Sequence, residues 1–356
     1  MNNVLITGGA GFIGSNFVHF ILRKNINVNI INLDALKYSG SLENLRNLPD
    51  SEHYTFVKGD ICDAGLISQL LQEYAIDTIV HFAAESHVDR SISTPSQFVQ
   101  TNIIGTFTLL EAARLYWSEV SKERKICRFH HISTDEVYGS LESDSPPWTE
   151  TSPYDPHSPY AASKAASDHL VRAYGNTYKL PYTLSNCSNN YGPYQFPEKL
   201  IPLMILNALQ GKTLPVYGDG LQIRDWLHVE DHCDAIYMIL ENGLPGSSYN
   251  ICGGNQPTNL FIVETLCDIL DEVIPDSIQK PHRQLIRFVN DRRGHDRRYA
   301  LNALKIHDEL GWQPRHSLQQ GLRETVEWYL GHPEWISEIR SKKSYIDWME
   351  ENYKYR

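Results

Sequence analysis

The chain has 356 residues, of which 41% are hydrophobic, so it can bury a sizeable core as one large α/β domain or as two lobes. A formal net charge of −11 argues against a general binder of nucleic acid or membrane surfaces. The six cysteines have neither a C-x-x-C pair nor metal-site spacing, and no signal peptide or membrane-spanning run is visible, so a cytoplasmic protein with reduced thiols and no metal is expected.

A glycine-rich turn follows the first predicted strand, at residues 4–7, and leads into a helix. Gly8, Gly11 and Gly14 let the backbone turn sharply and approach a pyrophosphate, which free N–H groups and the helix dipole stabilise. A second apolar run ends in Asp34, where a carboxylate can accept both ribose hydroxyls and repel a 2′-phosphate. The pattern predicts a dinucleotide site that prefers NAD over NADP.

Two further predicted strands end in loops at the same edge of the sheet. In a doubly wound sheet such loops line the cofactor crevice. Asp60 and Ile61 are therefore expected to meet the adenine, while the small Ala83 and Ala84 let the middle of the cofactor pass close.

Candidate catalytic side chains occur in two places. The next predicted strand ends in Thr134, Asp135 and Glu136, and repulsion within a buried acid pair would raise one pKa so that an acid and a carboxylate coexist. Tyr160 and Lys164 open a later helix and share a face one turn apart. A nearby ammonium favours tyrosinate, so the pKa of this phenol is expected to be lowered toward neutrality, which suits a general base for a sugar hydroxyl.

The second half of the chain contains candidate sugar and nucleotide groups. Beyond a strand predicted at 182–185, residues 186–193 are too polar for a strand and predict an amide-rich loop. Arg224 could supply a planar fork for a pyrophosphate, and Tyr217 a surface for a nucleobase. The basic cluster at 291–300 is interpreted as a diphosphate-binding loop, with a solvated turn as the alternative.

Other features are interpreted as structural. Asp63, Asp89 and Asn259 are expected to cap helices on the residue pattern alone. A helix predicted at 96–116 can join the Tyr160 helix in a dimer surface. The segment after the amphipathic helix at 318–330 is charged and aromatic and has no assignable chemistry.

These motifs together resemble a known family. Tyr160-x-x-x-Lys164 is typical of the extended short-chain dehydrogenase/reductases (NAD-dependent epimerase/dehydratases), and Ser-Thr-Asp-Glu-Val-Tyr-Gly at 133–139 resembles the dTDP-glucose 4,6-dehydratase branch. The resemblance runs from residue 4 to about 300. It implies a Rossmann-type doubly wound parallel sheet with a smaller carboxyl-terminal α/β lobe, divided near 1–185 and 186–356 with an interleaved boundary, and a homodimer.

The resemblance also implies a reaction and a site. The reaction is oxidation of dTDP-glucose at C4 by tightly bound NAD, loss of water across C5 and C6, and return of hydride to C6, in deoxysugar biosynthesis such as that of rhamnose. The implied catalytic residues are Thr134, Asp135, Glu136, Tyr160 and Lys164. The implied NAD-binding residues are Gly8, Gly11, Phe12, Ile13, Gly14, Asp34, Lys37, Asp60, Ile61, Ala83, Ala84, Ser86, Thr101, Tyr160, Lys164 and Asn190. The implied substrate-binding residues are His87, Thr134, Asn189, Lys199, Leu200, Pro215, Val216, Tyr217, Arg224, Asn259, Arg292 and His295.

Alternatives stay open at this point. A UDP-sugar C4-epimerase or UDP-glucuronate decarboxylase would lack the acid at Asp135, and a GDP-mannose 4,6-dehydratase would usually have serine there and prefer NADP, which Asp34 opposes. A redox-sensing NAD(H)-binding protein is the non-enzymatic alternative. Lys37 stands where the family usually has threonine and Asn302 where it usually has aspartate. Uridine differs from thymidine by one methyl group, worth only about 1–3 kcal/mol, so the base is not fixed.

Overall fold

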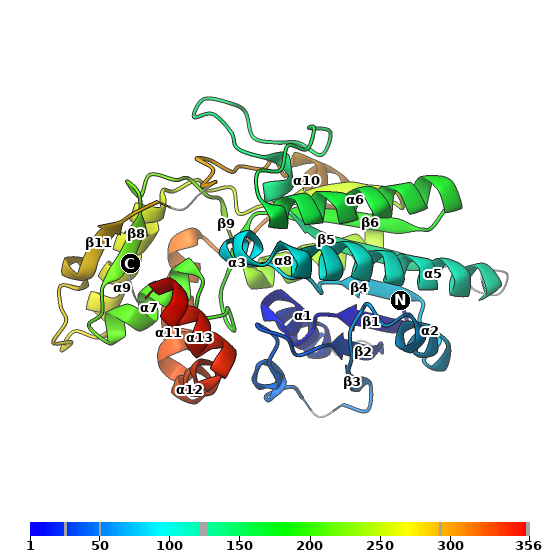
Figure 1. The fold of residues 1–356 in the computed structure, drawn as a ribbon, viewed down its shortest axis with the longest axis horizontal. Helices are drawn as coiled ribbons and strands as arrows, with labels where there is room; N and C mark the ends of the chain where they lie inside the picture. Colours follow the sequence, from blue (N-terminus) through cyan, green and yellow to red (C-terminus); the bar gives the residue numbers. More distant parts are fainter. Residues whose placement is uncertain (25–26, 50, 121–126, 292–293, 354–356) are drawn as a thin grey trace.

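The computed structural model describes residues 1–356 except 25–26, 50, 121–126, 292–293 and 354–356. Within the described residues, seven strands form one parallel sheet in the order β10-β6-β5-β4-β1-β2-β3 (Figure 1). Its strands are β1 (Asn3–Thr7), β2 (Asn29–Asp34), β3 (Tyr54–Lys58), β4 (Thr78–His81), β5 (Arg128–Thr134), β6 (Tyr182–Cys187) and β10 (Ser248–Ile251). The predicted Rossmann-type sheet is therefore confirmed.

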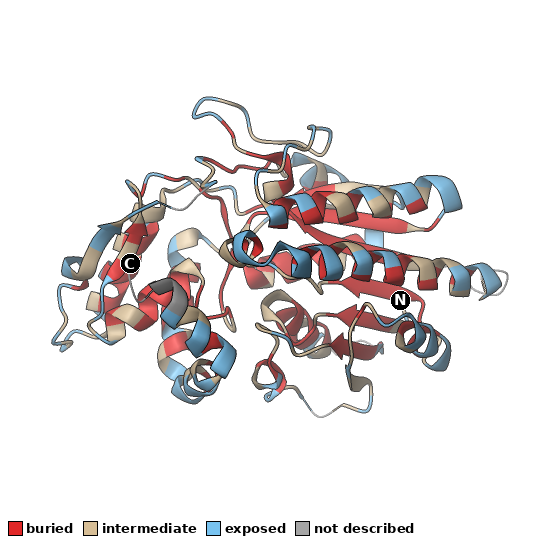
Figure 2. Cartoon of the chain, viewed as in Figure 1, coloured by how far each residue is buried: buried red, intermediate tan, exposed pale blue. Residues whose placement is uncertain are grey.

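Successive side chains along the strands of this sheet pack alternately into two cores, one on each face. Leu5 of β1 packs into one core with α2 (Ala64–Glu73), α5 (Thr106–Val120) and α6 (Pro159–Tyr178), whereas its neighbours Val4 and Ile6 pack with α1 (Phe12–Arg23) and α8 (Val229–Asn242). These three side chains are at most 3% exposed. Figure 2 shows the strands of the large sheet mostly in red, the colour of buried residues. Burial of each such side chain stabilises the folded protein by about 1.5–3 kcal/mol.

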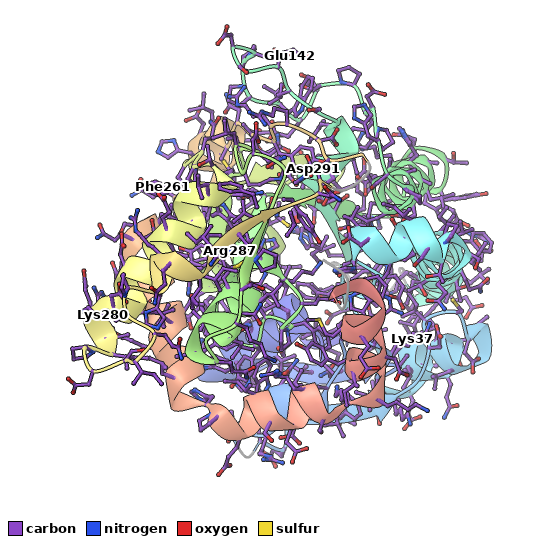
Figure 3. The ribbon with its side chains drawn as sticks, turned by 60° about the vertical axis from the view of Figure 1, so that its left-hand side comes forward. Lys37, Glu142, Phe261, Lys280, Arg287 and Asp291 are labelled. Carbon is purple, nitrogen blue, oxygen red and sulfur yellow. The ribbon has the colours of Figure 1, made fainter. Side chains whose placement is uncertain are left out.

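A smaller lobe packs beside the carboxyl ends of the strands and has its own core. Its elements are the parallel pair β8 (Leu214–Tyr217) and β11 (Ile286–Val289), with α7 (Leu200–Leu209), α9 (Asn259–Val273), α11 (Leu318–Gly331), α12 (Pro333–Ser341) and α13 (Lys343–Tyr353). A second short parallel pair consists of β7 (Asn189–Tyr191), which comes directly after β6 in the chain, and β9 (Trp226–His228), which directly precedes α8. Figure 3 shows Phe261, Lys280 and Arg287 on the outer side of this lobe, away from Lys37 in the dinucleotide half. The division at residues 185 and 186 stays a prediction, but β10 and α8 come from beyond it and pack with the large sheet.

One expectation about a chain segment is wrong, and another is confirmed with a local change of helix type. Residues 186–193 are not one loop, because Asn186 continues β6 and residues 189–191 form β7. The buried Asn186 amide donates to the Thr134 carbonyl at 3.1 Å, so its polarity is satisfied inside the sheet. The helix expected at 96–116 is present, as the contiguous run of α4 (Pro95–Phe98), a π-helical segment (Val99–Gly105) and α5.

Of the three expected helix caps, one is confirmed. Asp63 caps α2 by accepting the Leu66 N–H at 3.0 Å. Asp89 lies inside the first turn of α3 (Val88–Ser93), where the ring of His87 is the cap, and Asn259 is the first residue of α9, which Thr258 caps. Among the described residues, no helix combines the length and apolar character needed to cross a membrane.

Candidate active site

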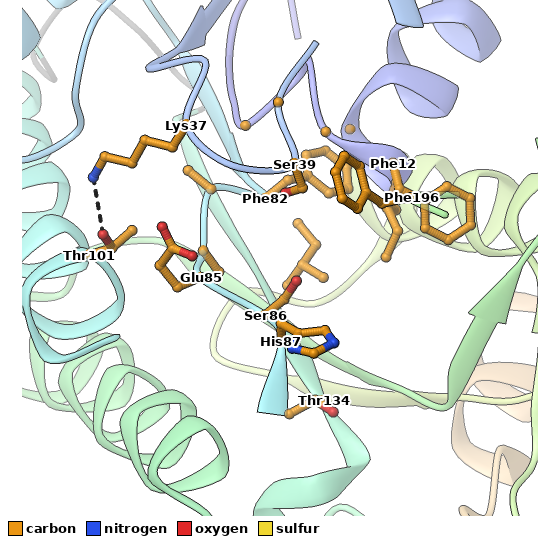
Figure 4. A pocket seen from close by; sticks show the side chains of 18 of the residues that line it. Phe12, Lys37, Ser39, Phe82, Glu85, Ser86, His87, Thr101, Thr134 and Phe196 are labelled. Atoms are coloured by element: carbon orange, nitrogen blue, oxygen red, sulfur yellow. Dashed lines mark hydrogen bonds between the residues drawn. The ribbon is translucent and has the colours of Figure 1, made fainter. Parts of the chain in front are cut away.

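A cavity lies where the loops after β1, β2, β4, β5 and β6 meet (Figure 4). All sixteen predicted NAD-binding residues and all five predicted catalytic residues line it. Of the predicted substrate residues, it brings in His87, Thr134, Asn189 and Lys199. The geometry thus places the dinucleotide motif, the acid pair and the tyrosine–lysine pair around one space.

The turn after β1 forms a cradle that fits a dinucleotide pyrophosphate. Gly8 has a φ of +75°, which a residue with a side chain rarely adopts, and a Cβ there would lie 2.6 Å from the nitrogen of Ala83. A Cβ on Gly14 would lie 2.2 Å from the Gly8 carbonyl oxygen. Side chains at these two positions would fill the space that lets a ligand approach the backbone and the start of α1.

Asp34 is fixed at the end of β2 by backbone donors. Its carboxylate accepts the Ala10 N–H at 2.9 Å and the Leu36 N–H at 2.7 Å. Burial raises the pKa of Asp34, and those two N–H groups oppose the shift. A carboxylate held at this place suits the ribose hydroxyls of NAD.

Lys37 connects the loop after β2 to two neighbouring segments on the cofactor side of the cavity. Its ammonium lies 2.9 Å from the Asp60 carboxylate and donates to the Thr101 hydroxyl at 3.3 Å (Figure 4). The π-helical segment carries Thr101, so the lysine links it to the loops after β2 and β3.

The acid pair begins a 3₁₀ turn directly after β5. Asp135 is 2% exposed, its Oδ1 accepts from the Thr134 hydroxyl at 3.2 Å, and its Oδ2 has no hydrogen-bond partner among the described residues. Burial, and then the charge of Glu136, raise the pKa of Asp135 to about 8. Glu136 is only partly buried. The pair therefore presents one neutral acid and one carboxylate at neutral pH, as the sequence predicted.

Tyr160 and Lys164 line the same cavity from the first two turns of α6. The expected lowering of the Tyr160 pKa is wrong: burial, and then Glu136, raise it well above the usual value, while the Thr134 hydroxyl opposes them. The Lys164 ammonium does not outweigh these effects: it donates to the Ile132 carbonyl on β5 at 2.7 Å, and burial lowers its own pKa to about 8.

The remaining predicted substrate residues lie outside this cavity, mostly around the loops of the small lobe. The rings of Tyr217 and His295 are 6.1 Å apart. Arg224 is buried, donates to the carbonyls of Ile223 and Asp296 at 2.7 and 2.9 Å, and covers the Tyr299 ring at 4.3 Å. Leu200, Pro215, Val216 and Asn259 belong to the adjoining elements α7, β8 and α9. Arg292 lies outside the described residues.

Sequence reasoning missed two contributors. Glu198 lines the cavity, is 4% exposed, accepts from the Tyr38 hydroxyl at 2.5 Å and lies 3.6 Å from the His87 ring nitrogen. Burial raises the pKa of Glu198 to about 7. The adjacent Lys199, which donates to the Ser86 carbonyl at 3.2 Å, was predicted to bind substrate, and its position was the sequence feature that could have drawn attention to Glu198.

The second contributor is the carboxyl-terminal segment. Lys342 donates to the Gly40 carbonyl at 2.8 Å, beside Asp34, and the Trp348 ring meets the His87 ring edge-on at 5.2 Å. No local pattern identifies these residues, because the contacts join positions about 260 to 300 residues apart in the sequence.

Comparison with known proteins shows the family of the chain. The family model described as GDP-mannose 4,6 dehydratase matches residues 5–325. The dTDP-glucose 4,6-dehydratase of Shigella flexneri is 54% identical over 362 residues, covering 99% of each chain, and that of Neisseria gonorrhoeae is 56% identical over 334 residues, covering 92% of this chain and 95% of the relative. The dTDP-glucose 4,6-dehydratase of Streptomyces venezuelae, solved with NAD and TYD bound, is 46% identical with a TM-score of 0.85, covering 95% of this chain and 99% of that one.

Proposed function

The chain belongs to the dTDP-glucose 4,6-dehydratases of the extended short-chain dehydrogenase/reductase family, and from this premise we propose that it converts dTDP-glucose to dTDP-4-keto-6-deoxyglucose and water. The observation that carries the proposal is the buried Asp135 beside Glu136 in the cavity that holds Tyr160 and Lys164. An epimerase or decarboxylase has no use for an acid that protonates a leaving hydroxyl. The enzyme is an NAD-dependent hydro-lyase.

The residues at the strand end divide the proton transfers. Tyr160, bonded to Thr134, takes the proton of the C4 hydroxyl, and a charged Lys164 stabilises the phenolate that forms. Glu136 then removes the proton from C5, which the neighbouring ketone has made acidic. Asp135 gives its proton to the C6 hydroxyl, which leaves as water. When bound, NAD would supply a hydride acceptor for the oxidation at C4 and, in its reduced form, the hydride donor for C6.

The two acids cannot exchange these roles easily. Asp135 is almost fully buried and keeps its proton at neutral pH, so it is suited to donate. Glu136 is more accessible from the cavity and carries the charge that raises its neighbour's pKa, so it is suited to accept. The roles follow from environment, not from residue type.

The nucleotide part of the substrate is proposed to bind at the small lobe. Tyr217 and His295 offer two aromatic faces for the base, and Arg224 and Lys199 supply positive charge near the diphosphate in an otherwise acidic protein. Thymidine preference over uridine rests on a methyl contact, so a modest ratio is expected.

Mass spectrometry of dTDP-glucose incubated with the protein, without added reductant, tests the reaction. Loss of one water is expected. In D₂O, Asp135→Asn should still exchange the C5 hydrogen but eliminate slowly, whereas Glu136→Gln should block both. Asp144→Asn and Glu142→Gln, at exposed acids on the loop after β5, are the matched controls. An unchanged mass with inversion at C4 would mean an epimerase.

The assembly is proposed to be a homodimer that forms across the paired helices α5 and α6. Partly exposed apolar side chains gather on these helices and the segment before them: Val99, Ile104, Phe107, Leu115 and Tyr178, each 41–52% exposed. Such a face is normally covered in a stable protein. Sedimentation should give a dimer, Phe107→Asp a monomer, and a wild-type monomer at micromolar concentration would remove the proposal. The six free thiols fit a cytoplasmic location.

A further inference from the structure

A buried carboxylate lies one helical turn beyond Lys164. Asp168 is 0% exposed, and its Oδ2 accepts from the Ser133 hydroxyl at 2.8 Å and the Tyr154 hydroxyl at 2.9 Å. A weaker contact from the Asn186 amide, at 3.4 Å, adds to these. Burial raises the pKa of Asp168, but His131, and then Lys164 and the Ser133 hydroxyl, lower it by more, so the pKa lies below its usual value. Asp168 therefore stays ionised, and none of the proton transfers proposed above uses it.

The ring of His131 lies between this carboxylate and Lys164. Its Nε2 is 3.2 Å from Oδ1 of Asp168 and 3.4 Å from the Lys164 ammonium, with the Ser167 hydroxyl at 3.3 Å. Its Nδ1 is buried and has no hydrogen-bond partner among the described residues. Oδ1 of Asp168 is likewise buried without a hydrogen-bond partner among the described residues, so the ring and the carboxylate are in contact without a well-formed hydrogen bond. Burial lowers the pKa of His131 to about 4, so a neutral ring lies between the anion and the cation.

The groups that face Lys164 show why this anion matters. They are the Ile132 carbonyl and His131 on β5, His81 on β4, Cys187 on β6, and Tyr160 and Asp168 on α6. Burial lowers the pKa of His81 and raises that of the Cys187 thiol to about 12, so both are uncharged at neutral pH. Of these described groups, Asp168 alone carries negative charge. A buried ammonium without a counter-charge costs several kcal/mol and readily loses its proton.

We propose that Asp168 is a positioning residue for the reaction, whose buried negative charge acts across the neutral His131 ring to keep Lys164 charged and in place at the cavity that holds the catalytic residues. The inference deepens the proposed function, since it concerns the lysine on which Tyr160 depends. Burial has already lowered the pKa of Lys164 to about 8, and the Asp168 charge is what opposes a further fall. Without that charge Lys164 would be largely neutral at physiological pH, and the tyrosinate would lose its stabilising cation.

The first test is the pH profile of the near-isosteric variant Asp168→Asn. The alkaline limb of kcat combines loss of the Lys164 proton with loss of the Asp135 proton, since both groups have a pKa of about 8, and the part that belongs to Lys164 should move to lower pH by about 1–3 units, the range for loss of a nearby opposite charge. Asp168→Glu, which keeps the charge, should return the limb toward its wild-type position. Asp231→Asn is the matched control: Asp231 is 3% exposed and bonds the His316 ring at 2.9 Å, but it lies away from Lys164. A purely structural role would lower kcat or the melting temperature of Asp168→Asn and leave its alkaline limb in place, which would overturn the proposal.

A second test does not depend on turnover. Removal of one member of a buried ion pair leaves the charge of the other uncompensated, so Lys164→Met and Asp168→Asn should each lower the melting temperature. In the double variant the decrease in melting temperature should be smaller than the sum of the two single decreases. Strict additivity would overturn the proposed pairing. If Asp168→Asn alone does not fold, recovery of folding in the double variant supports the pairing and its absence refutes it. A wild type that leaves dTDP-glucose unchanged would defeat the proposed function, while this thermal cycle would still decide the pairing.

Discussion

A methyl group added at Gly14 tests the dinucleotide cradle. The alanine Cβ would lie 2.2 Å from the Gly8 carbonyl oxygen and 2.8 Å from the Gly9 Cα, far inside the 3.5–4.0 Å at which carbon atoms attract. The Gly8 carbonyl cannot move away freely, because it accepts the Gly11 N–H at 3.1 Å, while the Gly8 N–H donates to the Leu33 carbonyl at 2.9 Å. Overpacking of this kind costs about 1–3 kcal/mol.

We therefore expect Gly14→Ala to lower the free energy of unfolding by that amount and to weaken NAD binding by roughly 10- to 100-fold, since about 1.4 kcal/mol corresponds to tenfold. Calorimetric titration of the nucleotide-free protein, with thermal unfolding alongside, measures both. Gly65→Ala is the matched control: Gly65 lies on the exposed side of α2, and its Cβ would make only an ordinary 3.4 Å contact with Asp63. That variant should keep its NAD affinity and gain about 0.5–1 kcal/mol of stability. Wild-type NAD affinity in Gly14→Ala would refute the cradle.

Three further substitutions test other parts of the site. Asp34→Asn removes the charge that repels a 2′-phosphate, so the preference for NAD over NADP in direct titrations should fall by about tenfold or more, and an unchanged ratio would contradict the ribose contact. Burial raises the pKa of Asp135 to about 8, so the folded state holds a proton that the unfolded chain loses near pH ~4, and stability falls as pH rises between the two values. Asp135→Asn should lack this part of the decline in melting temperature, whereas Asp144→Asn should keep it. Lys342→Met should lower the fraction of NAD that stays bound through gel filtration, because its hydrogen bond to the Gly40 carbonyl beside Asp34 is lost. The control Lys343→Met, at an exposed lysine, should keep the wild-type fraction. Equal NAD retention in both variants would show that Lys342 does not support the cofactor site.

Much of the dinucleotide half could be predicted because its determinants are local. The glycine turn, the strand-end Asp34 and the pair Tyr160 and Lys164 each occupy a few consecutive residues, and parallel strands bring their carboxyl ends to one edge. The acid pair was predictable for the same reason. Its unequal protonation followed from proximity and burial, and the structure bears this out at Asp135.

The errors arose where the environment outweighs the residue type. Asn186 is polar, yet it lies inside β6 because the Thr134 carbonyl accepts its amide. The Tyr160 pKa rises where the sequence suggested a fall, because burial and Glu136 act more strongly than the lysine one turn away. Periodicity carries no information on how completely a side chain is removed from water.

Long-range contacts were a second source of omission. Asp168 follows Lys164 by one helical turn, so the spacing places both on one face of α6, but the burial of that face against His131 of β5 comes only from the fold. Lys342 comes from a segment with no recognisable motif, and the packing of the carboxyl-terminal helices beside the loop after β2 brings it to Gly40. Such residues can be identified only after the tertiary structure is known.

The measurement that tests the central claim most directly is the fate of deuterium placed at C4 of dTDP-glucose. If the protein oxidises C4, eliminates water across C5 and C6, and returns the same hydride, the product will have lost one water and will carry the deuterium at C6 without added reductant. Mass spectrometry with fragmentation of the sugar locates the label. A product that has lost water but not retained the deuterium, or a label that stays on C4 of an unchanged or inverted sugar, would contradict the account.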